Sequence, residues 1–232
     1  MPPLEFETLW FNAQEDTVFC WGGAVTGWGD TVPELAKLMA PPEDAIWALR
    51  IDRKERTGRW SRLNSYPKEI PRRSYASSAC DGYACYVVGG FVGNRTSTFT
   101  DIEDPPVTMP GLLEFEFKSR SLTNHSVLTS QYWGSTFNLP AHTPADMIFV
   151  PNFGRQGIYI LVGGQGATSS ESGWDAKNAQ WHFQNVTVFD PSTKAFYSQP
   201  TKGPFPNMNQ YLKPRFHCAV GAVDYKQRIF DM

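Results

Sequence analysis

Three glycine doublets are the residues of this chain whose type and spacing most resemble a chemical site. They are Gly22-Gly23, Gly89-Gly90 and Gly163-Gly164, and each ends an apolar run. Glycine lets backbone N–H groups approach an anion, so each doublet could form a phosphate-binding loop. No Gly-Lys-Ser or Gly-Lys-Thr follows any of them, however, and no helix-forming sequence follows Gly164. The doublets are therefore interpreted as structural, because glycine allows positive φ or a close approach where a strand ends.

Metal ligation and nucleophilic catalysis need side chains at short spacings, which the four histidines lack. Only His217, beside Cys218, lies near another potential ligand. Neighbouring residues of a strand point to opposite faces, so this pair is not expected to share a metal. No Cys-x-x-Cys and no Gly-x-Ser-x-Gly occurs either, which removes the common zinc and serine hydrolase signals. The sequence predicts no catalytic residue, no metal site and no cofactor.

Two of the four cysteines flank a strong hairpin signal. Cys80 and Cys85 lie on either side of Asp81-Gly82, a pair typical of two-residue turns. That turn would pair Cys80 with Tyr83 and Ser78 with Cys85, leaving the two sulfurs diagonal at roughly 7 to 8 Å. This spacing is unfavourable for a disulfide, so the cysteines are predicted to be buried, structural thiols.

Carboxylates and tryptophans gather in the long polar stretches after the doublets. The carboxylates could hold a hard cation or act as an acid/base pair, but solvated loop charge is the better interpretation. Asp104, for example, precedes Pro105-Pro106, which predicts an exposed turn. Trp28 and Trp174 lie where a core has no evident need of them, so either packing or exposed recognition is open for these two residues. The acidic residues considered are Glu34, Glu43, Asp44, Asp101, Glu103 and Asp104.

Composition favours short strands and argues against two classes of partner. Aromatic residues make up 14% of the 232 residues, with 19 glycines and 18 prolines, which predicts an all-β chain with many turns. A net charge of −2 provides no basic field for nucleic acid. No apolar run approaches the roughly 20 residues that span a bilayer, so this segment is not expected to enter a membrane. Residues 1–20 also lack the basic start and apolar block of a signal peptide.

The elements that position these residues repeat along the chain. Gly22 and Gly89 are separated by 67 residues, and Gly89 and Gly163 by 74. After each doublet come a polar stretch, a strand, a short charged turn and a further strand. The middle strands are expected at Ile46–Asp52, Leu112–Phe117 and Val186–Asp190. An entry strand precedes the doublet at Ala76–Cys80 and at Met147–Val150, so each unit should contain four strands.

The units contain the proline-arginine entries at Pro71-Arg72-Arg73 and Lys213-Pro214-Arg215 and the aromatic strands that contain Trp60 and Phe196-Tyr197. In these features the units resemble kelch repeats. They are most similar to those of the kelch-repeat proteins of filamentous fungi. This resemblance implies a kelch-type β-propeller with four-stranded blades and innermost first strands. Trp60, Tyr86 and Tyr159 should pack between blades, and a single helical turn is expected at Pro33–Met39 with Thr31 as its cap. The units are expected at about 1–66, 67–133 and 134–211, with a further blade starting at 212–232.

Three complete units and the start of a further one amount to about three and a half blades, fewer than the four to eight of closed propellers. The chain is therefore predicted to form an open arc and not a ring, as a truncated gene model, an isoform or a fragment would.

Because no nucleophile with a base, no metal spacing and no cofactor fingerprint is found, the chain is predicted to be a non-catalytic scaffold. It would recognise a protein or ligand through loops between the second and third strands of each blade. These loops are predicted at Ala24–Asp44, Phe91–Pro110 and Gln165–Gln180 and should share one face. The alternative is a copper-dependent enzyme similar to galactose oxidase, or another metalloenzyme, on the same blades; substitution of His142 or His217 would test it. The candidate recognition residues are Trp28, Asp30, Arg95, Asp101 and Trp174.

Three Asn-x-Ser/Thr triplets leave the localisation open. They begin at Asn94, Asn124 and Asn185 and would accept N-linked glycans if the protein is secreted. The fungal proteins that the chain resembles are often anchored at the membrane outside the cell. In a cytoplasmic protein the same asparagines would be ordinary polar residues.

Overall fold

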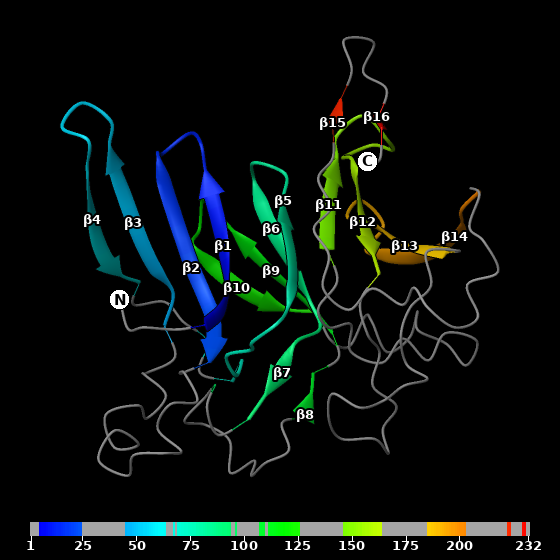
Figure 1. Cartoon of the computed structure of the whole chain (residues 1–232), viewed down its shortest axis with the longest axis horizontal. Helices are drawn as coiled ribbons and strands as arrows, with labels where there is room; N and C mark the ends of the chain where they lie inside the picture. Colours follow the sequence, from blue (N-terminus) through cyan, green and yellow to red (C-terminus); the bar gives the residue numbers. More distant parts are fainter. Residues whose placement is uncertain are drawn as a thin grey trace.

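Three four-stranded antiparallel sheets form the protein in the computed structural model (Figure 1). The structure describes residues 5–24, 45–63, 67, 69–93, 96, 107–109, 111–125, 146–163, 185–202, 222–223 and 229–230. Within these residues every regular element is a strand, which confirms the predicted all-β class. The first sheet has the order β1-β2-β3-β4, the second β10-β9-β6-β5 and the third β11-β12-β13-β14.

The strands of the sheets follow one another along the chain, so each sheet is one repeat. The first sheet consists of β1 (Glu5–Asn12), β2 (Thr17–Ala24), β3 (Trp47–Asp52) and β4 (Thr57–Arg62). The second consists of β5 (Ser77–Cys80), β6 (Ala84–Val88), β9 (Leu112–Glu116) and β10 (Ser121–Asn124). The third consists of β11 (Asp146–Val150), β12 (Ile158–Val162), β13 (Asn185–Asp190) and β14 (Ala195–Pro200).

Two small ribbons complete the described elements. β7 (Phe91–Val92) pairs with β8 (Val107–Thr108), and β15 (Ala222–Val223) pairs with β16 (Ile229–Phe230). The first ribbon lies within the predicted loop of the second repeat, where no strand was expected. The second lies in the residues assigned to the start of a further blade.

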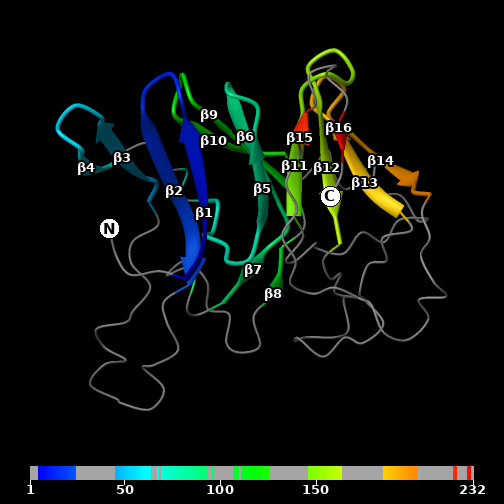
Figure 2. The ribbon, with the colours of Figure 1, turned by 45° about the horizontal axis from the view of Figure 1, so that its top comes forward.

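The sheets stand side by side with their first strands at the centre of an arc (Figures 1 and 2). The second repeat's inner strand, β5, lies against both β1 and β11. The sheets themselves pack face to face, which is the arrangement of propeller blades. The expected innermost position of the first strands is confirmed for these three sheets, and they form an open arc.

Aromatic side chains fill the space between the first and second sheets. Trp10, Phe19 and Trp21 face Phe115 and Phe117, and all five are at most 3% exposed. The Trp10 and Phe115 rings stack with centroids 4.8 Å apart. Burial of such large side chains is worth several kcal/mol each, so this cluster ties the two sheets together.

A second cluster joins the second and third sheets. Tyr86 lies with its ring centroid 5.0 Å from Tyr159 and 5.1 Å from Phe189. Tyr86 is 4% exposed and Tyr159 is fully buried, so both pack between sheets as the sequence predicted. Trp60 does not: it lies on β4, the outermost strand of the first sheet, and is 39% exposed. The prediction for Trp60 was wrong because no described sheet covers that face of β4.

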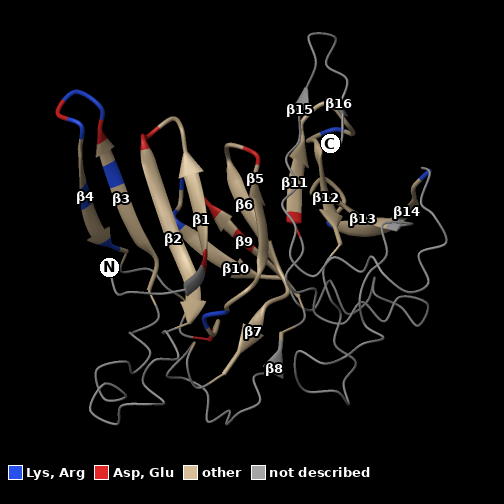
Figure 3. Ribbon diagram, viewed as in Figure 1, with Lys and Arg blue, Asp and Glu red and all other residues tan. Residues whose placement is uncertain are grey.

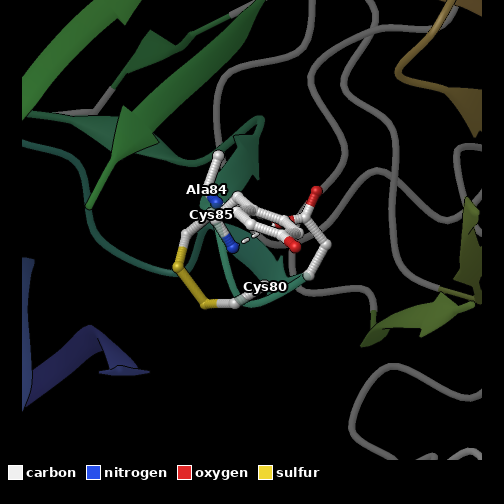
Figure 4. The surroundings of a disulfide bond; sticks show 5 residues. Cys80, Ala84 and Cys85 are labelled. Carbon is white, nitrogen blue, oxygen red and sulfur yellow. Dashed lines mark hydrogen bonds between the residues drawn. A yellow bond between two sulfur atoms is a disulfide. The ribbon is translucent and has the colours of Figure 1, made fainter. Parts of the chain in front are cut away.

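The expectation of two free thiols at Cys80 and Cys85 was also wrong, because the structure joins them in a disulfide (Figure 4). The two residues are direct partners in the β5–β6 register. Asp81 sets this register: its Oδ1 accepts hydrogen bonds from the backbone N–H groups of Tyr83 and Ala84, each at 2.8 Å. Asp81 N donates in turn to Ala84 O. The loop therefore includes Tyr83, and the two cysteines are opposite each other instead of diagonal.

Candidate recognition edge

The glycine doublets lie at one edge of the arc, where the second strand of each sheet ends. Gly22, Gly23, Gly89, Gly90 and Gly163 all have positive φ, between 63° and 97°. L-residues with side chains rarely adopt this conformation. Gly164 lies outside the described residues. The chain thus turns away from three strands at the same edge through a conformation that favours glycine.

The first doublet also requires glycine because another part of the backbone lies very close to Gly22. A Cβ on Gly22 would lie 2.5 Å from the carbonyl oxygen of Arg73. That same oxygen accepts a hydrogen bond of 2.8 Å from Gly23 N. The entry segment of the second repeat therefore contacts the doublet of the first repeat directly, and this hydrogen bond connects the two repeats.

The second doublet receives the same entry segment from the other side. A Cβ on Gly90 would lie 3.0 Å from each of three atoms, which belong to Arg73, Ser74 and Ala76. Arg73 Nη1 donates to Gly89 O at 3.2 Å. The Pro-Arg entry and two glycine doublets are thus parts of one structure. Residues 72–74 occupy the space between two successive doublets, and each doublet begins a predicted loop.

Arg72 anchors the loop that follows the second doublet. Its guanidinium Nε donates to Thr96 O at 2.5 Å. Thr96 in turn closes a turn with Gly93, whose N–H donates to Thr96 Oγ1 at 2.8 Å. Arg72 and Arg73 are each 1% exposed, so they support the loop base from within and do not offer their own charge to solvent.

All five predicted recognition residues lie outside the described part of the chain. This is so for Trp28, Asp30, Arg95, Asp101 and Trp174. It is also so for the glycosylation candidate Asn94, for His142 and His217, and for the turn expected at Pro33–Met39. Of the other two triplets, Asn124 is exposed at the end of β10 and Asn185 begins β13.

A polar cluster that the sequence did not indicate bridges the second and third sheets. Glu114 Oε2 lies 2.7 Å from His125 Nε2 and 2.8 Å from Lys194 Nζ. Tyr86 Oη donates to Glu114 Oε1 at 3.2 Å. Glu114 on β9 and His125, which directly follows β10, are only 11 residues apart, but Lys194 is 80 residues from Glu114. No short spacing in the sequence brings Lys194 to this pair.

The cluster holds Glu114 in its charged form. The hydrogen bond from His125 is the largest cause, burial opposes it, and Lys194 adds to it. As a result the pKa of the Glu114 carboxyl falls from 4.5 to about 2. This arrangement stabilises a carboxylate between two blades and does not prepare it for proton transfer near neutral pH.

The described residues show neither a metal-binding cluster nor a readily ionised thiol. No group of three or more His, Cys, Asp or Glu side chains that could hold a metal ion occurs among them. Cys20 has a free thiol, but it is 1% exposed and burial raises its pKa to about 12. A thiol so rarely ionised is a poor nucleophile. No helix of the described residues is long and apolar enough to cross a membrane.

Comparison with known proteins places the fold. No family model and no curated protein matches the chain. Among solved structures it is similar to YjhT, a kelch-type propeller protein, with a TM-score of 0.51 and 17% sequence identity. The match covers 88% of this chain and 53% of YjhT, so the chain spans about half the length of that protein. At this identity the likeness concerns the fold, and with the three radiating sheets it defines an open, propeller-like arc.

Proposed function

We propose that the chain is a non-catalytic scaffold of the kelch type, which binds a protein partner through the loops that follow β2, β6 and β12. The observation that carries this proposal is the buried segment 72–74, which fixes the bases of two successive loops at one edge. Loops on a rigid support commonly hold binding residues, because little freedom is lost when they bind. The candidate contacts are Trp28, Asp30, Arg95, Asp101 and Trp174.

The site chemistry favours recognition over catalysis. The shielded Glu114 carboxylate and the buried Cys20 thiol both have pKa values far from neutral pH, whereas a general acid or base works best near the operating pH. Arg72 and Arg73 donate hydrogen bonds to backbone carbonyl groups. Each of these polar groups supports the packing of the blades.

The Cys80–Cys85 disulfide supports an extracellular setting for this recognition. Disulfides persist in secreted proteins and are rare in the cytosol. The exposed Asn124, in an Asn-His-Ser triplet, would then accept a glycan. We accordingly place the proposed partner outside the cell or on its surface.

Affinity capture with matched variants tests the proposal. Biotinylated chain is incubated with surface and secreted proteins of the source cells, and captured proteins are quantified by mass spectrometry. A variant with serine at the five candidate positions should lose the proteins that the native chain enriches. The control, Tyr83→Ser with Phe153→Ser, removes aromatic residues that are 76% and 60% exposed in turns at the opposite edge, and it should retain them.

Two results would contradict the proposal. In the first, the five-residue variant captures the same proteins as the native chain. In the second, the purified protein holds one copper or iron per chain and loses it on substitution of His142 or His217. The second result would favour the metalloenzyme.

A further inference from the structure

The outer face of the first sheet carries a row of apolar side chains, several of which are exposed. Phe11, Val18, Leu49 and Trp60 are successive partners in the register across the four strands, so their side chains form one row on this face. Phe11 is 46% exposed and Trp60 is 39% exposed, and Leu9 on the same face of β1 is 60% exposed. These three are half of the six large hydrophobic side chains that are exposed in the described part of the chain. We call this surface, Leu9 with the row from Phe11 to Trp60, the leading face.

The equivalent faces of the other two sheets are buried interfaces. Counting back four residues from Gly22, Gly89 and Gly163 aligns Val18 with Cys85 and Tyr159. Cys85 packs against the first sheet and Tyr159 against the second, and both are fully buried. In the second and third sheets, the face that corresponds to the leading face is therefore covered by the preceding sheet. The leading face of the first sheet has the same orientation, and no sheet of the described residues covers it.

Each of the three sheets has a basic residue at the end of the turn before its last strand. Arg56, Arg120 and Lys194 each end the turn before the last strand of their sheet, with φ of 52°, 54° and 53°. Arg120 lies 3.3 Å from Glu15 of the first sheet, and Lys194 lies 2.8 Å from Glu114 of the second. Each of these two cations thus contacts a carboxylate of the preceding sheet. Arg56 lies in the charged turn between β3 and β4 (Figure 3), and the ion pairs between described residues do not include it.

We propose that the leading face of the first sheet binds a second copy of this chain, which presents the opposite end of its arc. There the third sheet offers a row of Ile148, Ile160, Val188 and Tyr197, the last 52% exposed. This pairing repeats the described interfaces, in which a leading face always meets the other face of a neighbouring sheet. Two such contacts related by a twofold axis join two arcs into one closed assembly.

Mass measurement across a concentration series tests the proposal. By light scattering after size exclusion, the full 232-residue chain should reach a plateau at twice its 26.1 kDa mass. Leu9→Lys and Phe11→Lys should each restore the single-chain mass, because a buried lysine has no partner in this interface. Phe153→Lys places the same charge on an exposed aromatic outside the face and should leave the dimer unchanged. Thermal unfolding of each variant checks that its fold is retained.

A mixing experiment tests the head-to-tail arrangement. Phe11→Lys blocks the leading face and Tyr197→Lys blocks the opposite end, so each variant alone should be monomeric. Their mixture retains one intact interface and should form a heterodimer. The proposal is overturned if the native chain stays monomeric, or if Phe11→Lys changes the mass no more than Phe153→Lys does. A Tyr197→Lys variant that dimerises as the native chain does would show that two leading faces pair with each other, which also contradicts it.

Discussion

The carbonyl oxygen of Arg73 lies 2.5 Å from the position that a Cβ on Gly22 would occupy. Real Cβ atoms do not approach a backbone oxygen so closely. The entry segment of the second blade and the doublet of the first are consequently fitted to each other, and glycine is required by space as well as by its φ of 84°.

Gly22→Ala should destabilise the fold by about 1 to 3 kcal/mol more than Gly82→Ala, as overpacking typically costs. Gly82 is the matched control, because its φ is 93° but nothing lies within 4 Å of an added Cβ. Both variants bear the cost of positive φ, and only Gly22→Ala also meets Arg73. Urea unfolding of the two variants measures the difference, and equal losses would contradict the close-approach explanation.

The Glu114 cluster predicts a defined loss of stability in acid. The pKa of Glu114 is lowered to about 2 in the folded state from 4.5, so its contribution is fully present above pH 4.5. It is lost as the pH falls from 4.5 towards 2, because the carboxylate must then be protonated. Native chain should therefore be more stable than Glu114→Gln at pH 7, and the difference should shrink over this range.

Urea unfolding at a series of pH values from 7 to 2 measures this difference. Glu116→Gln serves as the control, since Glu116 is exposed on the same strand and should change stability little at any pH. If the Glu114→Gln difference stayed constant down to pH 2, the cluster would not be the cause.

The Cys80–Cys85 disulfide should stabilise the folded chain by about 2 kcal/mol, since it closes a short loop. Dithiothreitol is expected to lower the melting temperature of the native chain to that of the Cys80→Ser/Cys85→Ala variant. The same reductant should leave the variant unchanged. A native melting temperature that does not respond to full reduction, verified by mass spectrometry, would show that the disulfide does not stabilise the folded chain.

The repeat, and with it the blade arrangement, could be predicted from the sequence because the glycine doublets mark corresponding strand ends. The first strand, β1, was not singled out. Its inward side chains, Thr8, Trp10 and Asn12, include two polar ones, whereas Leu9 and Phe11 point outward and are exposed. The apolar alternation that normally identifies a buried strand face is therefore absent, and only the pairing with β2 defines it.

The site was less accessible to sequence analysis, because its main features depend on contacts between repeats. The Pro-Arg entry was recognised as a repeated pattern, but its position between two doublets follows from how adjacent sheets pack. The Glu114 and Lys194 pair has the same origin. The prediction of the hairpin register was wrong for a local reason. Asp81-Gly82 indicated a two-residue turn, whereas the Asp81 side chain accepts hydrogen bonds from two backbone N–H groups and the loop is longer.

Small-angle X-ray scattering of monomeric chain tests the open arc most directly. The Phe11→Lys variant provides the monomer. A compact globule of 232 residues has a radius of gyration of about 17 Å. Three blades side by side in an open arc predict a clearly larger radius and an asymmetric distribution of interatomic distances. A radius near 17 Å with the symmetric distribution of a globule would contradict the propeller-like arc on which the proposed function depends.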